Sequence, residues 1–161
     1  MTRVRVIGCG NPDAGDDAVG LLAVREARSR LEAIPGVEVV ETAAALNAVH
    51  LLEGVAGAVV VDAVRTPGGG RAPGEIVRVQ AGPDGLPAWA GTSLSSHGLG
   101  LGEAVALLGA LGGAPRVVLL GVEVADVTAG HSLSAPVSAV LSRLVELVVA
   151  ETEGLAETVG P

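Results

Sequence analysis

Three carboxylates and one imidazole occupy positions in this chain where chemistry could take place. Asp16 and Asp17 stand between a strand pattern and a helix pattern near the N-terminus. Asp62 directly follows the apolar run 58–61, and His97 begins another helical segment. In open α/β sheets, chemistry is placed at the rim beyond the carboxyl ends of the parallel strands. The pattern therefore predicts a metal site where these residues meet at one edge of a sheet.

Each of these residues also has a structural explanation. One aspartate suffices to cap a helix, worth about 1 kcal/mol over alanine, so we expect Asp16 to cap and Asp17 to be the functional group. Asp62 follows three valines and is costly to bury unpaired, so it must face a cleft, a cation or several donors. A lone histidine such as His97 is more often an exposed residue at a helix start, but the two nearby acids favour a ligand.

The resulting donor set consists of two carboxylates, Asp17 and Asp62, and the imidazole of His97. Such oxygen and nitrogen donors suit zinc, nickel or manganese. Three protein ligands leave positions open for water or substrate, as in catalytic sites.

Alternating strand and helix patterns position these residues. Strand patterns cover Arg3–Cys9, Val37–Glu41, Gly57–Val64, Glu75–Gln80 and Arg116–Val122. Helix patterns cover Asp16–Glu32, Ala43–Glu53, His97–Gly112 and Ser134–Glu153. We expect the fourth strand to be antiparallel, because the connection before it is too short for a helical crossover. The alternation predicts a three-layer α/β/α fold with a mostly parallel sheet of about five strands.

Composition narrows the class of protein. The 161 residues suit a single domain, 1–161, whose tail after about residue 154 we expect to fray. The net charge of −8 and the lack of a basic cluster argue against nucleic acid and anionic membranes as partners. Neither a membrane-spanning run nor a secretory leader pattern is present, so we expect a cytoplasmic protein.

Residue types that are missing exclude further chemistries. The chain has no Lys, Tyr or Phe, which rules out Schiff-base chemistry, a phosphate-binding Walker lysine and a tyrosine general acid. The single cysteine, Cys9, cannot form an intramolecular disulfide and lies within a strand pattern. We expect it to be a small core residue and not a nucleophile.

The motifs together resemble those of a known family. The turn Gly8–Gly20 looks like the N-terminal signature of the NiFe-hydrogenase maturation endopeptidases. The similarity continues through Val61–Ala63, Pro73–Glu75, Ser96–Leu101, Gly121–Glu123 and Gly130–Ser134. These segments follow the family's order and spacing over nearly the whole chain, so their combination is far more specific than any one of them.

This resemblance implies a specific activity. Such enzymes remove a short C-terminal extension from the hydrogenase large-subunit precursor after its nickel has been installed. The family's metal-contacting positions fall on Asp17, Asp62 and His97, and the acid before the first of them falls on Asp16. The resemblance also implies that the precursor supplies the nickel, whereas zinc, cadmium or manganese can occupy the site in vitro. The implied fold is the three-layer arrangement already expected from the patterns.

Two departures from the family concern the site and its specificity. Position 17 is Asp where many relatives carry the longer Glu, so we expect a narrower or shifted ligand cage. Residues 41–45 lack the glycine-rich stretch frequent in relatives, which implies a different choice of precursor. We expect substrate specificity to reside in residues 64–95, because loops at a sheet edge contact substrate.

The implied mechanism assigns a catalytic role to all four residues. Asp17, Asp62 and His97 contact nickel held by the precursor, and water attacks the scissile bond with metal polarisation or carboxylate assistance. Asp16 orients the loop or assists proton transfer. Two alternatives stay open: a hydrolase with its own bound divalent metal acting on small peptides or amides, and a non-catalytic chaperone that recognises nickel centres without cutting.

Overall fold

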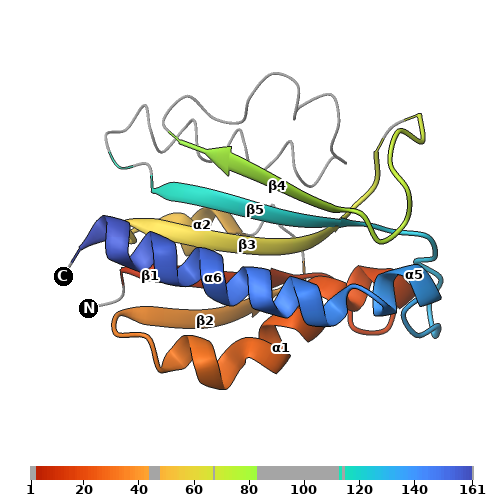
Figure 1. Cartoon of the computed structure of the whole chain (residues 1–161), viewed down its shortest axis with the longest axis horizontal. Helices are drawn as coiled ribbons and strands as arrows, with labels where there is room; N and C mark the ends of the chain where they lie inside the picture. The colour runs from red at the N-terminus through yellow and green to blue at the C-terminus, as the bar shows by residue number, and fades with distance from the viewer. Residues whose placement is uncertain (1–2, 44–47, 67, 83–112, 114, 161) are drawn as a thin grey trace.

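The computed structural model describes residues 3–43, 48–66, 68–82, 113 and 115–160. Its five strands are β1 (Val4–Cys9), β2 (Val37–Thr42), β3 (Gly57–Val64), β4 (Ile76–Ala81) and β5 (Arg116–Glu123). They form one sheet in the order β2-β1-β3-β5-β4 (Figure 1). All neighbouring strands are parallel except β4 and β5, which are antiparallel. The predicted mostly parallel sheet with an antiparallel β4 is confirmed.

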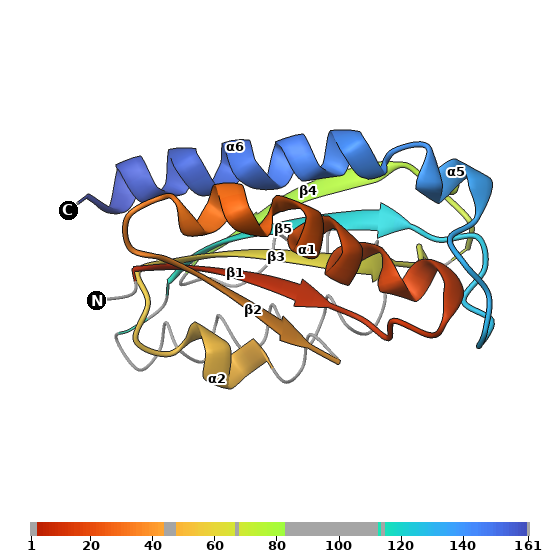
Figure 2. The ribbon, with the colours of Figure 1, turned by 90° about the horizontal axis from the view of Figure 1, so that it is seen from below.

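Helices lie on both faces of this sheet. The helical elements are η1 (Gly15–Ala18), α1 (Val19–Glu32), α2 (Ala48–Leu52), α5 (Ala135–Ser138) and α6 (Leu141–Val159). Helices α1 and α6 cover one face and α2 lies on the other (Figure 2). The predicted helix 97–112 and residues 44–47 of the predicted helix Ala43–Glu53 lie outside the described residues.

The central strands are buried on both sides. All eight residues of β3 are buried. Two adjacent residues of this strand, Val59 and Val60, belong to different hydrophobic cores, one on each face of the sheet. Val59 belongs to the core that α1 and α6 cover, whereas Val60 packs with Leu52 of α2. A parallel strand covered on both faces has no polar side, which explains why its sequence is apolar without alternation.

The C-terminal helical segment differs from the sequence-based expectation in two respects. The predicted helix 134–153 is two helices separated by a turn at residues 139–140. The chain after Gly154 does not fray but continues as α6 to Val159. Leu155 is only 8% exposed and seals the core over Gly57, where a Cβ would meet its side chain at 2.8 Å. The two chain ends meet at the same end of the molecule, where Arg3 hydrogen-bonds to the carbonyl of Gly160 (Figure 1).

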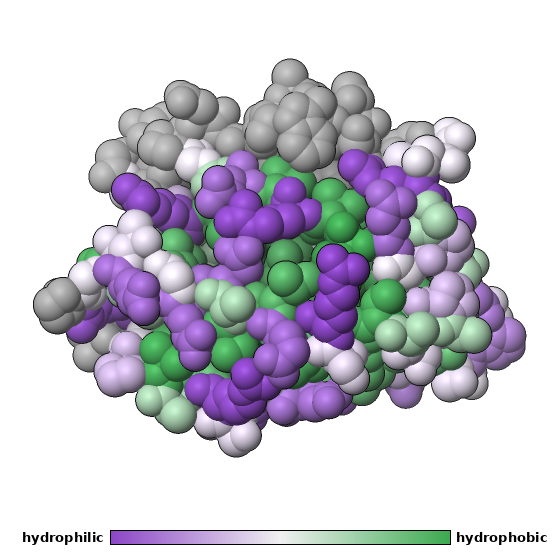
Figure 3. All heavy atoms as spheres, in the orientation of Figure 1, coloured by the Kyte–Doolittle hydropathy of each residue, from purple (hydrophilic) through white to green (hydrophobic). Residues whose placement is uncertain are grey.

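Ion pairs connect the elements on the α1 and α6 face. Arg30 of α1 contacts Glu146 of α6 at 2.6 Å, and Arg78 of β4 contacts Glu151. Hydrophilic side chains are accordingly spread over this face, with hydrophobic ones between them (Figure 3). Among the residues that the structure describes, no helix combines the length and apolar character needed to cross a bilayer.

Candidate active site

Glycines let the turn after β1 pack closely against the sheet edge. Gly10 has φ +137°, and a Cβ there would lie 1.9 Å from the carbonyl oxygen of Asp17. At Gly20 a Cβ would lie 2.3 Å from the carbonyl oxygen of Val61 and 2.7 Å from that of Cys9. Only a residue without a side chain permits such approaches. The start of α1 therefore sits directly on the carboxyl ends of β1 and β3.

Asp16 holds this turn to a distant loop. Its side chain is fully buried, and its carboxylate accepts four hydrogen bonds from the segment that follows β5. The donors are the backbone N–H groups of Ala125 (2.8 Å), Asp126 (2.9 Å) and Ser134 (2.7 Å) and the hydroxyl of Ser134 (2.8 Å). We call this arrangement the Asp16 clamp. Burial by itself raises the pKa of this carboxyl, but the four hydrogen bonds outweigh it and lower the pKa below its ordinary value.

The expectation that Asp16 caps the first helix is wrong. Neither η1 nor α1 has a side-chain cap, because the Asp16 carboxylate points to the loop after β5. Backbone hydrogen bonds reinforce the same contact, from Asp16 N–H to the Asp126 carbonyl (2.7 Å) and from Gly15 N–H to the His131 carbonyl (3.1 Å). The His131 ring in turn lies 2.6 Å from the Asp126 carboxylate. Turn and loop thus form one hydrogen-bonded unit.

Asp17 faces a hollow at the carboxyl edge of the sheet. One of its oxygens, Oδ2, accepts a hydrogen bond from the backbone N–H of Asn11 at 2.8 Å. The side chain lines a cavity of about 290 Å³ whose walls include Ala63, Val64 and Val124. We call this cavity the inner hollow. The hydrogen bond fixes the carboxylate at the edge of a largely apolar recess.

Asp62 reaches the same edge from β3. It is 2% exposed, and its Oδ1 accepts the backbone N–H of Ala63 at 2.8 Å. Cys9 lies at the end of the neighbouring strand β1, and both acids affect its pKa. Burial raises the pKa of the Cys9 thiol, and the negative charges of Asp62 and then Asp17 raise it further. The two carboxylates therefore lie within electrostatic reach of one buried thiol, which is a neutral packing residue as the sequence predicted.

His97, the third predicted ligand, lies outside the described residues. The described residues by themselves contain no cluster of three His, Cys, Asp or Glu that could hold a metal ion. The metal site formed by Asp17, Asp62 and His97 thus stays a prediction. Its two carboxylates lie at the same edge of the sheet. Oxygen donors of this kind fit a divalent cation.

Comparison with known proteins identifies the family. The sequence matches the family model HycI, described as hydrogenase maturation protease, over residues 22–151. This chain belongs to the hydrogenase maturation protease family. The matched segment contains Asp62 and His97, whereas Asp16 and Asp17 precede it. Among curated proteins, no match was found.

Solved structures of hydrogenase maturation proteases share the fold of this endopeptidase. The E. coli hydrogenase maturating endopeptidase HybD superposes with a TM-score of 0.73 at 24% identity, covering 95% of this chain and 93% of that one. HybD from Thermococcus kodakarensis gives 0.71 at 23% identity, with 94% and 99% covered. HycI from Thermococcus kodakarensis gives 0.64 at 24% identity, with 94% and 93% covered. At these identities the likeness concerns the fold.

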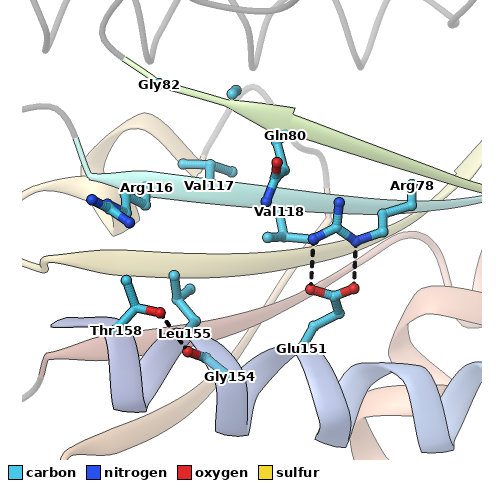
Figure 4. Close-up of a pocket in the computed structure, with 11 residues that line it drawn as sticks. Arg78, Gln80, Gly82, Arg116, Val117, Val118, Glu151, Gly154, Leu155 and Thr158 are labelled. Carbon is cyan, nitrogen blue, oxygen red and sulfur yellow. Dashed lines mark hydrogen bonds and ion pairs between the residues drawn. The ribbon is translucent and has the colours of Figure 1, made fainter. Parts of the chain in front are cut away.

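Another hollow of the protease, larger than the inner hollow at about 510 Å³, lies away from the acidic edge. It is formed by β4, β5 and α6, where the Arg78 guanidinium makes two hydrogen bonds to Glu151 (Figure 4). Arg116 also lines it, at the amino end of β5, which is the opposite sheet edge from Asp62. Neither Asp17 nor Asp62 lines this hollow. This hollow therefore lies at the opposite end of the sheet from the predicted site.

Sequence reasoning missed the partners of Asp16 and the surroundings of Asp17. The segment 130–134 resembles a family motif, but the motif by itself indicates no role for Ser134, whose N–H and O–H both donate to Asp16. Arg65 was missed altogether, although it lies three residues after Asp62 and lines the inner hollow. Its position directly after the last residue of β3 was the available signal.

Proposed function

We propose that this protease removes the C-terminal extension of a NiFe-hydrogenase large-subunit precursor after nickel insertion. Membership of the hydrogenase maturation protease family supports this class of substrate. The observation that carries the proposal is that Asp17 and Asp62 lie at one sheet edge, where Asp17 also lines the inner hollow. The edge lies at the carboxyl ends of parallel strands, where α/β proteins place their chemistry.

In this proposal the nickel is part of the substrate. Asp17, Asp62 and His97 supply two oxygen donors and one nitrogen donor, a set that suits nickel and leaves room for the precursor's own ligands. Asp17, Asp62 and His97 would hold nickel at this position, and the nickel would supply Lewis-acid chemistry to the scissile bond. A precursor without nickel offers no cation to the two carboxylates, so it stays uncut.

The protein's own residues position the reacting groups. The Asn11 N–H holds one oxygen of Asp17 in place, and the Asp16 clamp keeps the turn against the loop after β5. Because donors surround the Asp16 carboxylate and its pKa is lowered, Asp16 is poorly suited to accept a proton. We therefore assign it a positioning role, and assign contact with the substrate's metal to the other three residues.

The test is mass spectrometry of a co-expressed precursor, prepared with and without nickel. Wild-type protein is expected to remove the extension from the nickel-loaded precursor only. Asp17→Ala, Asp62→Ala and His97→Ala are each expected to slow this by about 100-fold or more, the cost of losing a correctly placed catalytic contact. Asp13→Ala is the matched control, because Asp13 is an exposed carboxylate on the same turn. Normal processing by all three site variants would refute the proposal.

The same samples separate the alternatives. A hydrolase with a resident metal would carry stoichiometric zinc or another divalent ion when purified without added metal, as elemental analysis would show. A chaperone would bind the nickel-loaded precursor and leave its mass unchanged. The proposed endopeptidase is expected to shorten the precursor and to contain no stoichiometric metal of its own.

A further inference from the structure

A second hollow continues the inner hollow away from Asp17. It measures about 480 Å³ and is lined by the loop after β3, including Arg65, Thr66 and Arg71. We call it the outer hollow. Arg65 and Val124 line both hollows, so the two are adjoining parts of one trough. This trough leads from the predicted catalytic edge to the loop that precedes β4.

The outer hollow presents positive charge. Arg65 is exposed, and within the described part of the chain its guanidinium has neither an ion pair nor a hydrogen bond. The guanidinium of Arg71 donates to the Thr66 hydroxyl at 3.0 Å and lies 4.0 Å from Glu75. The one buried acid in the wall, Glu123, already accepts the backbone N–H and the hydroxyl of Thr66, each at 2.8 Å. Arg65 is therefore the cation available to a ligand.

The inner hollow offers the complementary apolar surface. Val127 on its rim is 42% exposed, and it is the exposed large hydrophobic side chain of the described residues. Val64 and Val124 form the adjoining wall. A peptide lying along the trough would bury an apolar side chain beside Asp17 and bring a group further along to Arg65. Exposed apolar surface beside polar groups is typical of ligand-binding grooves.

We propose that Arg65 is a specificity-determining residue that binds a carboxylate on the C-terminal extension of the substrate. Arginine matches this group because its planar guanidinium can donate two parallel hydrogen bonds to one carboxylate. The carboxylate comes from an acidic side chain of the extension or from its C-terminus. This inference rests on the proposed function, because it assigns the extension to the trough beside the predicted cleavage site.

The first test compares Arg65→Ala and Arg65→Lys with Arg116→Ala. Arg116 is the matched control: it too is exposed and its guanidinium has no hydrogen bond or ion pair in the described structure, but it lines the hollow at the opposite sheet edge (Figure 4). For the nickel-loaded precursor, we expect Arg65→Ala to raise KM roughly 10- to 100-fold, the range for a lost charge-assisted hydrogen bond, with kcat changed less than about twofold. Arg65→Lys should restore part of the loss, and Arg116→Ala should behave as wild type.

A binding measurement gives the same comparison without cleavage. Fluorescence anisotropy with a labelled synthetic peptide of the extension, added to metal-free protein, is expected to show weaker binding to Arg65→Ala than to Arg116→Ala. If wild type does not shorten the nickel-loaded precursor, the proposed function fails. If wild type cuts normally and Arg65→Ala matches Arg116→Ala in both KM and peptide binding, only the present inference is overturned.

Two altered precursors identify the source of the carboxylate. In one, every Asp and Glu of the extension is replaced by Asn or Gln; in the other, a Gly-Ser tail moves the terminal carboxylate away. The precursor that no longer distinguishes wild type from Arg65→Ala has lost the carboxylate that Arg65 binds. If Arg65→Ala stays equally impaired on both precursors, Arg65 does not bind a carboxylate of the extension.

Discussion

Replacing Asp16 by Asn tests the Asp16 clamp with almost no change in side-chain size. The Oδ1 atom accepts the N–H of Ser134, and Oδ2 accepts two further backbone N–H groups and the Ser134 hydroxyl. Asparagine puts an NH₂ group at one of these two positions. In either orientation at least one backbone N–H then faces another donor, and the negative charge that strengthens the other bonds is lost.

These losses set the expected magnitude. A hydrogen bond to a charged group contributes about 1.5–3 kcal/mol, and a buried donor left without an acceptor costs about 1–3 kcal/mol. The separate losses are not additive, because the turn can relax and admit water. We therefore expect Asp16→Asn to lower the free energy of unfolding by about 3–5 kcal/mol, the range seen when a buried charged group is separated from its partners. With a urea slope near 2 kcal/mol per molar, the unfolding midpoint falls by about 2 M.

The assay is urea unfolding followed by far-UV circular dichroism, with Asp13→Asn as the control. Asp13 lies on the same turn, so the control replaces the same type of side chain at an exposed site. Exposed substitutions of this kind usually alter stability by less than about 0.5 kcal/mol. If the Asp16→Asn midpoint equals that of Asp13→Asn, the hydrogen bonds to Asp16 do not stabilise the fold and the reasoning is refuted.

The pH dependence of the same difference checks the cause. Burial raises the pKa of Asp16, but the hydrogen bonds from Asp126, Ser134 and Ala125 lower it overall. The unfolded chain, with an aspartate pKa of about 3.9, therefore binds more protons than the folded protein near that pH. The stabilisation is complete above this value and is lost as pH falls through the lower pKa of the folded state. The gap between wild type and Asp16→Asn should accordingly narrow in acid, and a gap that widens would contradict the assignment.

Three further substitutions and one chemical reaction probe the packing. Gly20→Ala should lower the free energy of unfolding by about 1–3 kcal/mol, because its Cβ would meet the Val61 carbonyl at 2.3 Å. In the same urea assay, Gly154→Ala in α6 should raise the free energy of unfolding by up to about 1 kcal/mol, because no atom lies within 4 Å of its Cβ position. Equal effects at the two glycines would show that the close approach is not required. Leu155→Ala should lower the free energy of unfolding by about 2–5 kcal/mol, because its side chain is 8% exposed, and an unchanged midpoint would mean that the end of α6 does not contribute to stability. The Cys9 thiol, buried and with a raised pKa, should react with a chromogenic disulfide reagent only after denaturation, and rapid reaction in the native protein would show that the sheet edge opens.

Much of the fold follows from the order of patterns along the chain. The uninterrupted apolar run of β3 indicated a parallel strand buried on both faces, and the short connection before β4 indicated its antiparallel direction. The break at residues 139–140 was not predictable, because the apolar stripe continues across it. Hydrophobic periodicity shows which side of a segment is buried, but it does not show where a helix is interrupted by a turn.

For the site, the sequence by itself indicated which acids lie at the sheet edge, since Asp17 follows the buried strand β1 and Asp62 lies near the carboxyl end of β3. Only the tertiary structure decided that Asp16 is a clamp and not a cap, because its partner Asp126 lies 110 residues further along the chain. Local preferences act over a few residues, and they favour the cap. The hydrogen-bond donors that Asp16 meets, and the trough that Arg65 lines, exist only after distant segments have packed against one another.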